Sequence, residues 1–246
     1  MTTGATIAAA DPQAAAKQKK SNKQHLARNK PSSKQKAPKS DRGEPDSIKY
    51  LGTTALRASH SEVRKLKREG HQPSIHGTKV WRSSFVLMNY LKQHPIPHQA
   101  RVMDIGCGWG LTGIFLAKRY HAEVTGIDAD ASVAPYLAAQ ARVNSVSINF
   151  EHKKFEQIRR HEMRGLHTLV GSDVCFWDEM VQPLFQLIQR AADVGVEQIL
   201  IADPGRSPFW ELAALCEKRF GAEVIEVSIA KPCKTSKQVL IVRPAP

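Results

Sequence analysis

The chain has 246 residues, of which 41% are hydrophobic, and a formal net charge of +13. This length supports one substantial core, and no apolar run of about 18 residues is present to span a bilayer. The first ten residues lack the basic start and the long apolar stretch of a secretory signal. Together these features argue against a membrane protein and predict a soluble, cytoplasmic one.

The four cysteines are spaced too irregularly for a metal site or a disulfide framework. Cys107, Cys175, Cys216 and Cys233 form no C-x-x-C pair, and the ten histidines show no H-E-x-x-H spacing. We therefore expect no metal, and we expect reduced thiols that are mostly buried.

Residues 1–45 carry more than half of the excess positive charge. They hold ten Lys or Arg against three acidic residues, which gives +7 of the total of +13. Large apolar side chains are almost absent, so the segment cannot bury enough surface to offset the entropy lost on ordering. We therefore predict a disordered basic tail. It suits a nonspecific electrostatic contact with RNA, ribosomes or acidic proteins, or the plain role of a solubilising leader.

Residues 46–79 are predicted to form a connector or lid that is partly helical. The stretch HSEVRKLKREG places Val63 and Leu66 three residues apart, as on one face of a helix. The helical pattern resumes at Val80, where large apolar side chains recur at i, i+4, i+7 and i+10: Trp81, Phe85, Met88 and Leu91. This spacing predicts an amphipathic helix that leads into the core of a domain spanning 80–246.

The rest of this domain alternates between strand and helix patterns. Strands are expected at 101–105, 122–128, 147–150, 166–173, 198–204, 222–230 and 237–244. Helices are expected after the first, second, fourth and fifth of these strands, at 110–120, 131–144, 179–194 and 208–220. This order predicts an α/β fold with a Rossmann-like, seven-stranded, mostly parallel sheet, helices on both faces and a C-terminal antiparallel hairpin.

The turn after the first of these strands is unusually rich in glycine. Asp104, Gly106, Gly108 and Gly110 form D-x-G-x-G-x-G, although one glycine would suffice for a tight turn. In an open α/β sheet this turn faces the ligand crevice, where bare backbone lets amide groups approach a ligand. Asp128 closes the next strand, where a carboxylate can accept both hydroxyl groups of a ribose. The two features together predict a nucleoside ligand.

The glycine spacing argues against a dinucleotide. The pyrophosphate fingerprint G-x-G-x-x-G/A needs a small residue three positions after Gly108, and that position is Leu111. The motif instead resembles the first motif of the seven-stranded methyltransferases that use S-adenosylmethionine, a likeness that covers roughly 80–244. The resemblance implies that the loop from Gly106 to Gly110 holds the methionine part and Asp128 the ribose. It also places four further residues at the cofactor: Trp81, Asp104, Phe155 and Ser172.

A narrower resemblance concerns the methyl acceptor. VWRSSFVLMNYL and GSDVCFW are similar to the tryptophan-bearing segment and the Asp-x-x-Tyr/Phe signature of the protein lysine methyltransferase-like group. DPGR at 203–206 resembles a turn in bacterial relatives of the enzymes that methylate the electron-transfer flavoprotein β-subunit. The resemblance implies a protein lysine as substrate and Asp173 and Phe176 as catalytic residues, with Asp173 orienting the amine. Phe176 stands where tyrosine is commoner, which removes a hydroxyl group that could hold a substrate.

Other functions fit the same residues. An RNA or a small nitrogenous molecule can also accept a methyl group, although the Asn-Pro-Pro-Tyr/Phe signature of base-amine methyltransferases is absent after the fourth strand. A noncatalytic binding protein can keep the same fold. In each enzymatic case we expect direct displacement, in which a lone pair attacks the sulfonium methyl group and the protein supplies alignment. The sequence leaves the oligomeric state open.

Overall fold

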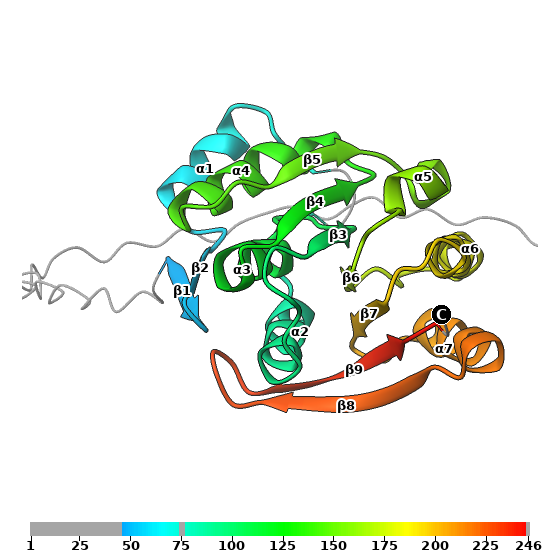
Figure 1. Ribbon diagram of the computed structural model, residues 1–246. Coiled ribbons are helices and arrows are strands. Elements are labelled where there is room, and N and C mark those ends of the chain that lie inside the picture. The colour runs from blue at the N-terminus through cyan, green and yellow to red at the C-terminus, as the bar shows by residue number, and fades with distance from the viewer. Residues whose placement is uncertain (1–45, 74–76, 245–246) are drawn as a thin grey trace, which may run out of the picture. The chain divides into compact units, whose positions relative to one another are not determined.

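The computed structural model describes residues 46–73 and 77–244, so the predicted disordered tail at 1–45 lies outside the described residues. A seven-stranded sheet has the order β5-β4-β3-β6-β7-β9-β8 (Figure 1). Its parallel strands are β3 (Arg101–Ile105), β4 (Glu123–Asp128), β5 (Asn149–His152), β6 (Thr168–Ser172) and β7 (Gln198–Asp203). The antiparallel pair is β8 (Glu223–Ile229) and β9 (Thr235–Val242), with β9 lying next to β7. The predicted sheet and its C-terminal hairpin are confirmed.

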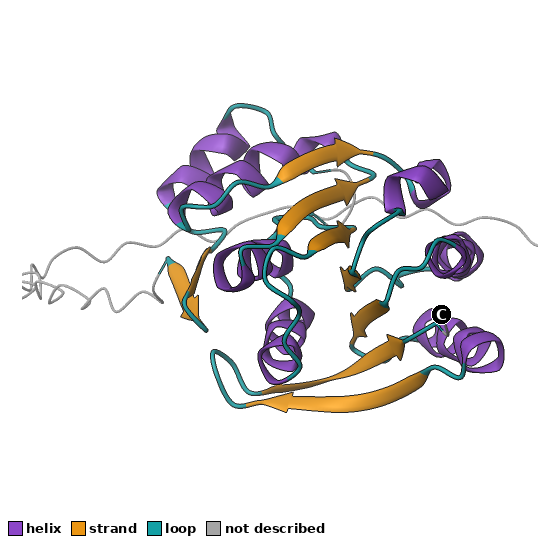
Figure 2. Cartoon of the chain, in the orientation of Figure 1, coloured by secondary structure: helices purple, strands orange, loops and turns teal. Residues whose placement is uncertain are grey.

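Helices cover both faces of this sheet (Figure 2). One face carries α2 (Arg82–Gln93), α3 (Leu111–Tyr120) and α4 (Ala134–Val143), and the other carries α5 (Arg160–Met163), α6 (Val181–Asp193) and α7 (Ser207–Phe220). One cluster of buried apolar side chains lies between the sheet and α2 and α3, and a second lies beneath α6 and α7. No helix in the described part of the chain is both long enough and apolar enough to cross a membrane.

The central strands direct their carboxyl ends to one edge of the sheet. Because such strands are buried on both faces, they are apolar along nearly their whole length, and in β7 only the first residue is not fully buried. Polar residues then appear where the strands end, with Asp128 closing β4, Ser172 closing β6 and Asp203 closing β7. At this edge the fold can therefore place polar side chains beside a ligand.

Several predicted elements begin later than expected, among them the helix before the first parallel strand and the strand predicted at 147–150. The helix predicted from Val80 begins at Arg82, and Trp81 is its N-cap with an extended backbone (φ −94°, ψ 146°), so the prediction placed Trp81 inside the helix wrongly. The strand predicted at 147–150 pairs with β4 only from Asn149. Its delay follows from Ser145, whose left-handed backbone (φ 57°) is still turning the chain out of α4.

The connector contains a hairpin that the sequence did not predict. β1 (Ser47–Tyr50) and β2 (Thr53–Leu56) precede α1 (Ser61–Arg68), which is the helix that was predicted. Two amide side chains, one from α4 (Gln140) and one from its C-cap residue (Asn144), occupy the free edge of β2. Gln140 accepts from the Leu56 N–H at 2.8 Å and donates to its carbonyl at 2.9 Å, and Asn144 binds Thr54 in the same way at 2.8 and 2.7 Å. The side chains thus stand in for a further strand and fix the connector to the domain.

Candidate active site

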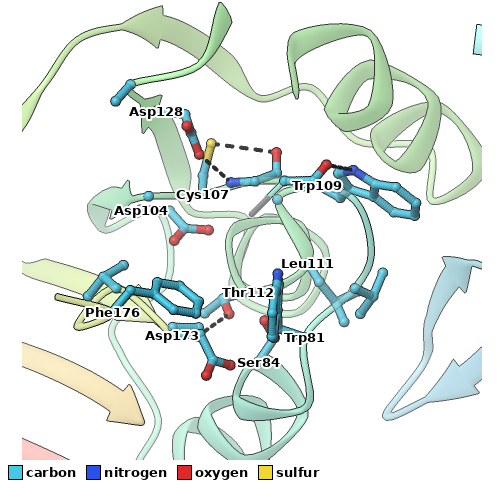
Figure 3. Close-up of a pocket in the computed structure, with 18 of the residues that line it drawn as sticks. Trp81, Ser84, Asp104, Cys107, Trp109, Leu111, Thr112, Asp128, Asp173 and Phe176 are labelled. Carbon is cyan, nitrogen blue, oxygen red and sulfur yellow. Dashed lines mark hydrogen bonds between the residues drawn. The ribbon is translucent and has the colours of Figure 1, made fainter. Parts of the chain in front are cut away.

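A pocket opens at the carboxyl edge of the parallel strands (Figure 3). Its walls come from the turn after β3, the ends of β4 and β6, and the segment 77–81 that leads into α2. All ten residues predicted for the site line it: Trp81, Asp104, Gly106, Gly108, Gly110, Asp128, Phe155, Ser172, Asp173 and Phe176. The residues predicted from the sequence therefore lie together around one pocket, and the role of each toward a ligand stays a prediction.

The three glycines of the loop differ in what a side chain would meet. A Cβ atom at Gly106 would lie 2.7 Å from Val174 Cγ1, and one at Gly110 would lie 3.0 Å from Leu137. A Cβ atom at Gly108 would meet nothing within 4 Å, although Gly108 lines the pocket. Neighbouring side chains therefore leave no room for a side chain at Gly106 or Gly110. At Gly108 the space is open, so a ligand can approach the backbone.

Asp128 holds the glycine loop to the end of β4. One carboxylate oxygen accepts from the Gly108 N–H and the other from the Asp130 N–H, each at 2.9 Å. Burial raises the pKa of Asp128, and these backbone hydrogen bonds oppose that rise. Each oxygen keeps a lone pair, so the carboxylate can also accept two hydroxyl groups of a ribose.

Asp128→Ala should weaken the binding of S-adenosylmethionine by about tenfold to hundredfold. Each charge-assisted hydrogen bond to a hydroxyl group contributes about 1.5 to 3 kcal/mol, and water at the mutated site recovers part of the loss. Isothermal calorimetry measures the change. Asp128→Asn, which keeps the shape and one acceptor, should fall between wild type and alanine, and equal affinity in all three proteins would remove Asp128 from the ribose site.

Asp104 is a buried acid beneath the same loop. Its carboxylate accepts from the Gly113 N–H at 3.0 Å, and the residue is 3% exposed. Burial raises the pKa of Asp104 from 3.8 to about 7; the Gly113 hydrogen bond opposes this rise, and the negative charge of Asp128 adds to it. An ionised Asp104 is therefore costly in the free protein, and a positively charged ligand in the pocket would relieve that cost.

Asp104→Asn should raise the melting temperature of the free protein above pH 7 while it weakens cofactor binding. The unfolded chain binds fewer protons than the folded chain between pH 3.8 and about 7, so stability falls as pH rises through this range, by up to about 4 kcal/mol. The difference in melting temperature between Asp104→Asn and wild type should shrink as pH falls toward 5, where Asp104 is protonated in the folded wild-type protein. Thermal scans and calorimetry on either side of pH 7 test this, and a gain that does not depend on pH would contradict it.

Asp173, which lines the pocket, belongs to a largely buried cluster of ion pairs behind the pocket wall. Arg206 Nη1 lies 3.1 Å from Asp173 Oδ1 and 2.6 Å from Asp203 Oδ2. The other oxygen of Asp203 accepts the backbone N–H groups of Gly205 and Arg206, each at 2.9 Å. Asp203 therefore shapes the Pro-Gly turn, and Asp173 shares its guanidinium partner.

Asp173 does not cap a helix, although aspartate often has that role near a helix start. The N-cap of α6 is Met180, and Trp177 is the N-cap of the 3₁₀ helix η3 (Asp178–Met180); neither end has a side-chain cap. Asp173 instead has a left-handed backbone (φ 58°) directly after β6, and its N–H donates to the Ala202 carbonyl at 2.8 Å. Its Oδ2 atom has no hydrogen-bond partner in the described part of the chain.

Aromatic rings form the wall beside this cluster. The ring of Phe176 lies 5.5 Å from that of Trp81 in an edge-on arrangement, and Arg206 Cζ lies 4.2 Å from the Phe176 centroid. Lys79 Nζ lies 4.5 Å from the Trp81 centroid. Figure 3 shows Phe176 and Trp81 on the same side of the pocket as Asp173, away from Asp128. The pocket therefore has a glycine-lined end and an acidic, aromatic end.

Sequence reasoning missed several residues of the pocket. Thr112 Oγ1 lies 3.3 Å from Ser172 Oγ, which ties the start of α3 to the end of β6. The Trp109 ring stacks on Tyr136 at 5.1 Å, and its Nε1 donates to the Gly77 carbonyl at 2.8 Å, which holds the connector against the glycine loop. A tryptophan between two glycines was the available signal, because so large a ring needs a partner when it is buried.

The glycine-lined end of the pocket is suited to S-adenosylmethionine. Open backbone at Gly108 and the remaining lone pairs of Asp128 can hold the nucleoside and methionine parts, and Phe155 lies where η2 (Phe155–Gln157) follows β5. Cys107 lies in the same loop, but burial, together with the charges of Asp104 and Asp128, raises the pKa of its thiol well above the usual range. Cys107 is therefore protonated and fills space rather than acting as a nucleophile.

This chain resembles known proteins in part of its sequence and in its fold. Residues 102–195 match the family model described as a methyltransferase domain. Among proteins with curated descriptions, none matches the sequence of this chain. The solved structures that it resembles include a SAM-dependent methyltransferase from Agrobacterium tumefaciens, with a TM-score of 0.62, 14% identity and coverage of 85% of this chain and 73% of that one.

Two further likenesses are to proteins of thermophilic bacteria. The 16S rRNA N2 G1207 methyltransferase RsmC of T. thermophilus, solved with AdoMet and guanosine, has a TM-score of 0.55 and 20% identity, covering 81% of this chain and 50% of that one. TrmN from Thermus thermophilus has a TM-score of 0.53 and 11% identity, covering 66% and 49%. This chain thus spans about half the length of both proteins. At such identities the likeness is one of fold.

Proposed function

We propose that this chain, an S-adenosylmethionine-dependent methyltransferase of the seven-stranded class, methylates the side-chain amine of a protein lysine. The observation that carries the proposal is the acidic, aromatic acceptor end of the pocket. Asp173 and Asp203 share the single guanidinium of Arg206, so the cluster has one net negative charge when both acids are ionised. Such surroundings favour a cationic or amine-bearing acceptor.

Asp173 is the residue best placed to orient that amine. Its Oδ1 atom is held by Arg206, which fixes the carboxylate, and its Oδ2 atom remains available to accept an N–H bond from the acceptor. A carboxylate stabilises the charged form of an amine, so Asp173 orients the lone pair and does not act as a general base. The ordinary pKa of lysine is about 10.4, and the proton leaves to solvent as the amine loses water in the pocket.

The cofactor, when bound, supplies a methyl group on a positively charged sulfur. The residues of this chain align the acceptor with that group: Asp173 sets the direction of the nitrogen lone pair, and the rings of Phe176 and Trp81 shield the acceptor from water. Alignment of this kind can lower the barrier to reaction by about 7 to 11 kcal/mol. The positive charge of the cofactor's sulfur, close to the acceptor nitrogen, would also favour the neutral, reactive form of the amine.

An exocyclic amine of an RNA base is the second candidate acceptor. The likeness to RsmC extends over 81% of this chain, and residues 1–45 carry seven net positive charges, which would attract a phosphate backbone. Rings such as Phe176 and Trp81 can also stack on a base. The acidic cluster at Asp173 favours the lysine, because its net negative charge attracts a cationic side chain and repels an anionic backbone.

Label transfer from radioactive S-adenosylmethionine distinguishes the two candidates. The purified full chain is incubated with the labelled cofactor and a cell extract, and the macromolecular product is then digested separately with protease and with nuclease. The proposal predicts label that protease releases and nuclease does not. Label that only nuclease releases would overturn it in favour of RNA, and label found solely in small molecules would overturn both.

A further inference from the structure

An exposed surface adjoins the pocket at the end where Asp173 lies, and it shares Trp177 with the pocket lining. Trp177 follows Phe176 directly, and Trp210 lies in the first turns of α7; each is 47% exposed. Tryptophan is usually well buried because its ring removes a large apolar area from water. Two indole rings exposed on one part of a surface are therefore a feature that a binding partner would explain.

A continuous chain of contacts connects the two indoles. The ring of Trp177 lies 5.8 Å from that of Phe176, and Phe176 stacks on Arg206. The neighbouring Gly205 packs against Trp210, since a Cβ atom there would lie 3.4 Å from Trp210 Nε1. The 3₁₀ helix η3 also contacts α7. Both indoles thus belong to one surface, centred on the turn that holds Asp173 in place.

The charges on this surface are negative. Asp178 and Glu179 follow Trp177, and Glu211 follows Trp210; all three are exposed, and none forms an ion pair within the described residues. We call this set the rim: Trp177, Asp178, Glu179, Trp210 and Glu211. Arg206 lies beneath the rim and is held by two buried carboxylates, and Lys79 lies against Trp81.

We propose that the rim is the docking surface for a basic peptide segment that carries the target lysine, an inference that rests on the proposed function. An indole face attracts an arginine or lysine side chain by about 0.5 to 1 kcal/mol at an exposed site, and more where water is excluded. Three unpaired acids beside the indoles attract the same cations and raise the rate of encounter. An RNA backbone would be repelled by those acids, so the rim favours a protein over a nucleic acid.

Charge reversal on the rim provides the test. The probe is a short synthetic peptide in which norleucine replaces a single central lysine and arginines flank it, so binding is measured without methyl transfer. Its affinity for the full chain is read from fluorescence anisotropy. Glu211→Lys, and Asp178→Lys together with Glu179→Lys, should each weaken binding by about threefold to tenfold, since each adds repulsion in place of an exposed attraction. Added salt should reduce the wild-type affinity.

Matched variants isolate the location from the change in charge. Glu217→Lys makes the same reversal at an exposed position on α7 beyond the first two turns, and it should leave the affinity unchanged. Trp210→Ala removes an indole without any change of charge and should weaken binding to a similar degree as Glu211→Lys. Melting temperatures within a few degrees of wild type establish that each variant is folded.

The outcomes separate the docking surface from the proposed function. Equal peptide affinity in wild type and in every rim variant would overturn the docking surface, even if lysine methylation is observed. Rim-dependent binding with no transfer to any lysine peptide would support the docking surface and count against lysine as the acceptor. A single-stranded RNA that binds more tightly than the peptide, and displaces it, would overturn the inference.

Discussion

Gly108→Val should abolish the binding of S-adenosylmethionine while the sheet and its helices remain folded. A Cβ atom at Gly108 would meet no protein atom within 4 Å, so a branched side chain would extend into the pocket and fill the space that a ligand needs. The same change puts a β-branched residue at φ 52°, which costs about 1 to 2 kcal/mol. Calorimetry and thermal unfolding measure the two effects separately.

Gly221→Val is the matched control for this variant. Gly221 also has a left-handed backbone (φ 64°) and open space beside it, but it ends α7 and does not line the pocket. The two variants should therefore lose similar stability, and only Gly108→Val should lose the cofactor. Wild-type affinity in folded Gly108→Val would contradict the assignment of the glycine loop to the cofactor.

Asp173→Asn should reduce methyl transfer on the order of hundredfold and leave cofactor affinity nearly unchanged. Asparagine tolerates the left-handed backbone at this position, and its oxygen can still accept from Arg206, so the local structure should persist. Its amide nitrogen would replace the free oxygen Oδ2 and would present a donor to the donor groups of the acceptor amine. Loss of alignment of this kind affects turnover more than binding.

Asp173→Ala separates the chemical role of this acid from its structural one. Removal of the carboxylate deprives Arg206 of one of its two partners, so this variant should also lose about 1 to 3 kcal/mol of stability. Each protein is measured for melting temperature, cofactor affinity and transfer of labelled methyl groups. Full transfer activity in Asp173→Asn would remove this residue from the acceptor site.

Local patterns predicted the sheet and the residues that form the glycine-lined end of the pocket. The alternation of apolar strands with amphipathic helices determines the element order, because each element must bury one face against its neighbours. The glycine loop and Asp128 are close in sequence and lie at successive strand ends, so their spacing alone brings them together. Both are cases in which sequence distance and spatial distance agree.

Contacts between distant residues were not predictable in this way. The hairpin β1–β2 is held by Gln140 and Asn144, which are 84 to 90 residues away in sequence, and its four-residue strands have too little alternation to be seen alone. Asp173 and Arg206 are 33 residues apart. The motif DPGR drew attention to its own turn, but nothing in either segment shows that a guanidinium in one is shared with a carboxylate in the other.

The most direct test of the central claim is to identify the methylated atom in the labelled product. Protein labelled by the full chain and radioactive S-adenosylmethionine is hydrolysed to free amino acids, which are separated by chromatography beside methylated standards. The proposal predicts that the label elutes as methyl-lysine with the wild-type chain and that it disappears with Gly108→Val. Label that elutes with another methylated amino acid, or that is confined to the nucleic-acid fraction, would contradict it.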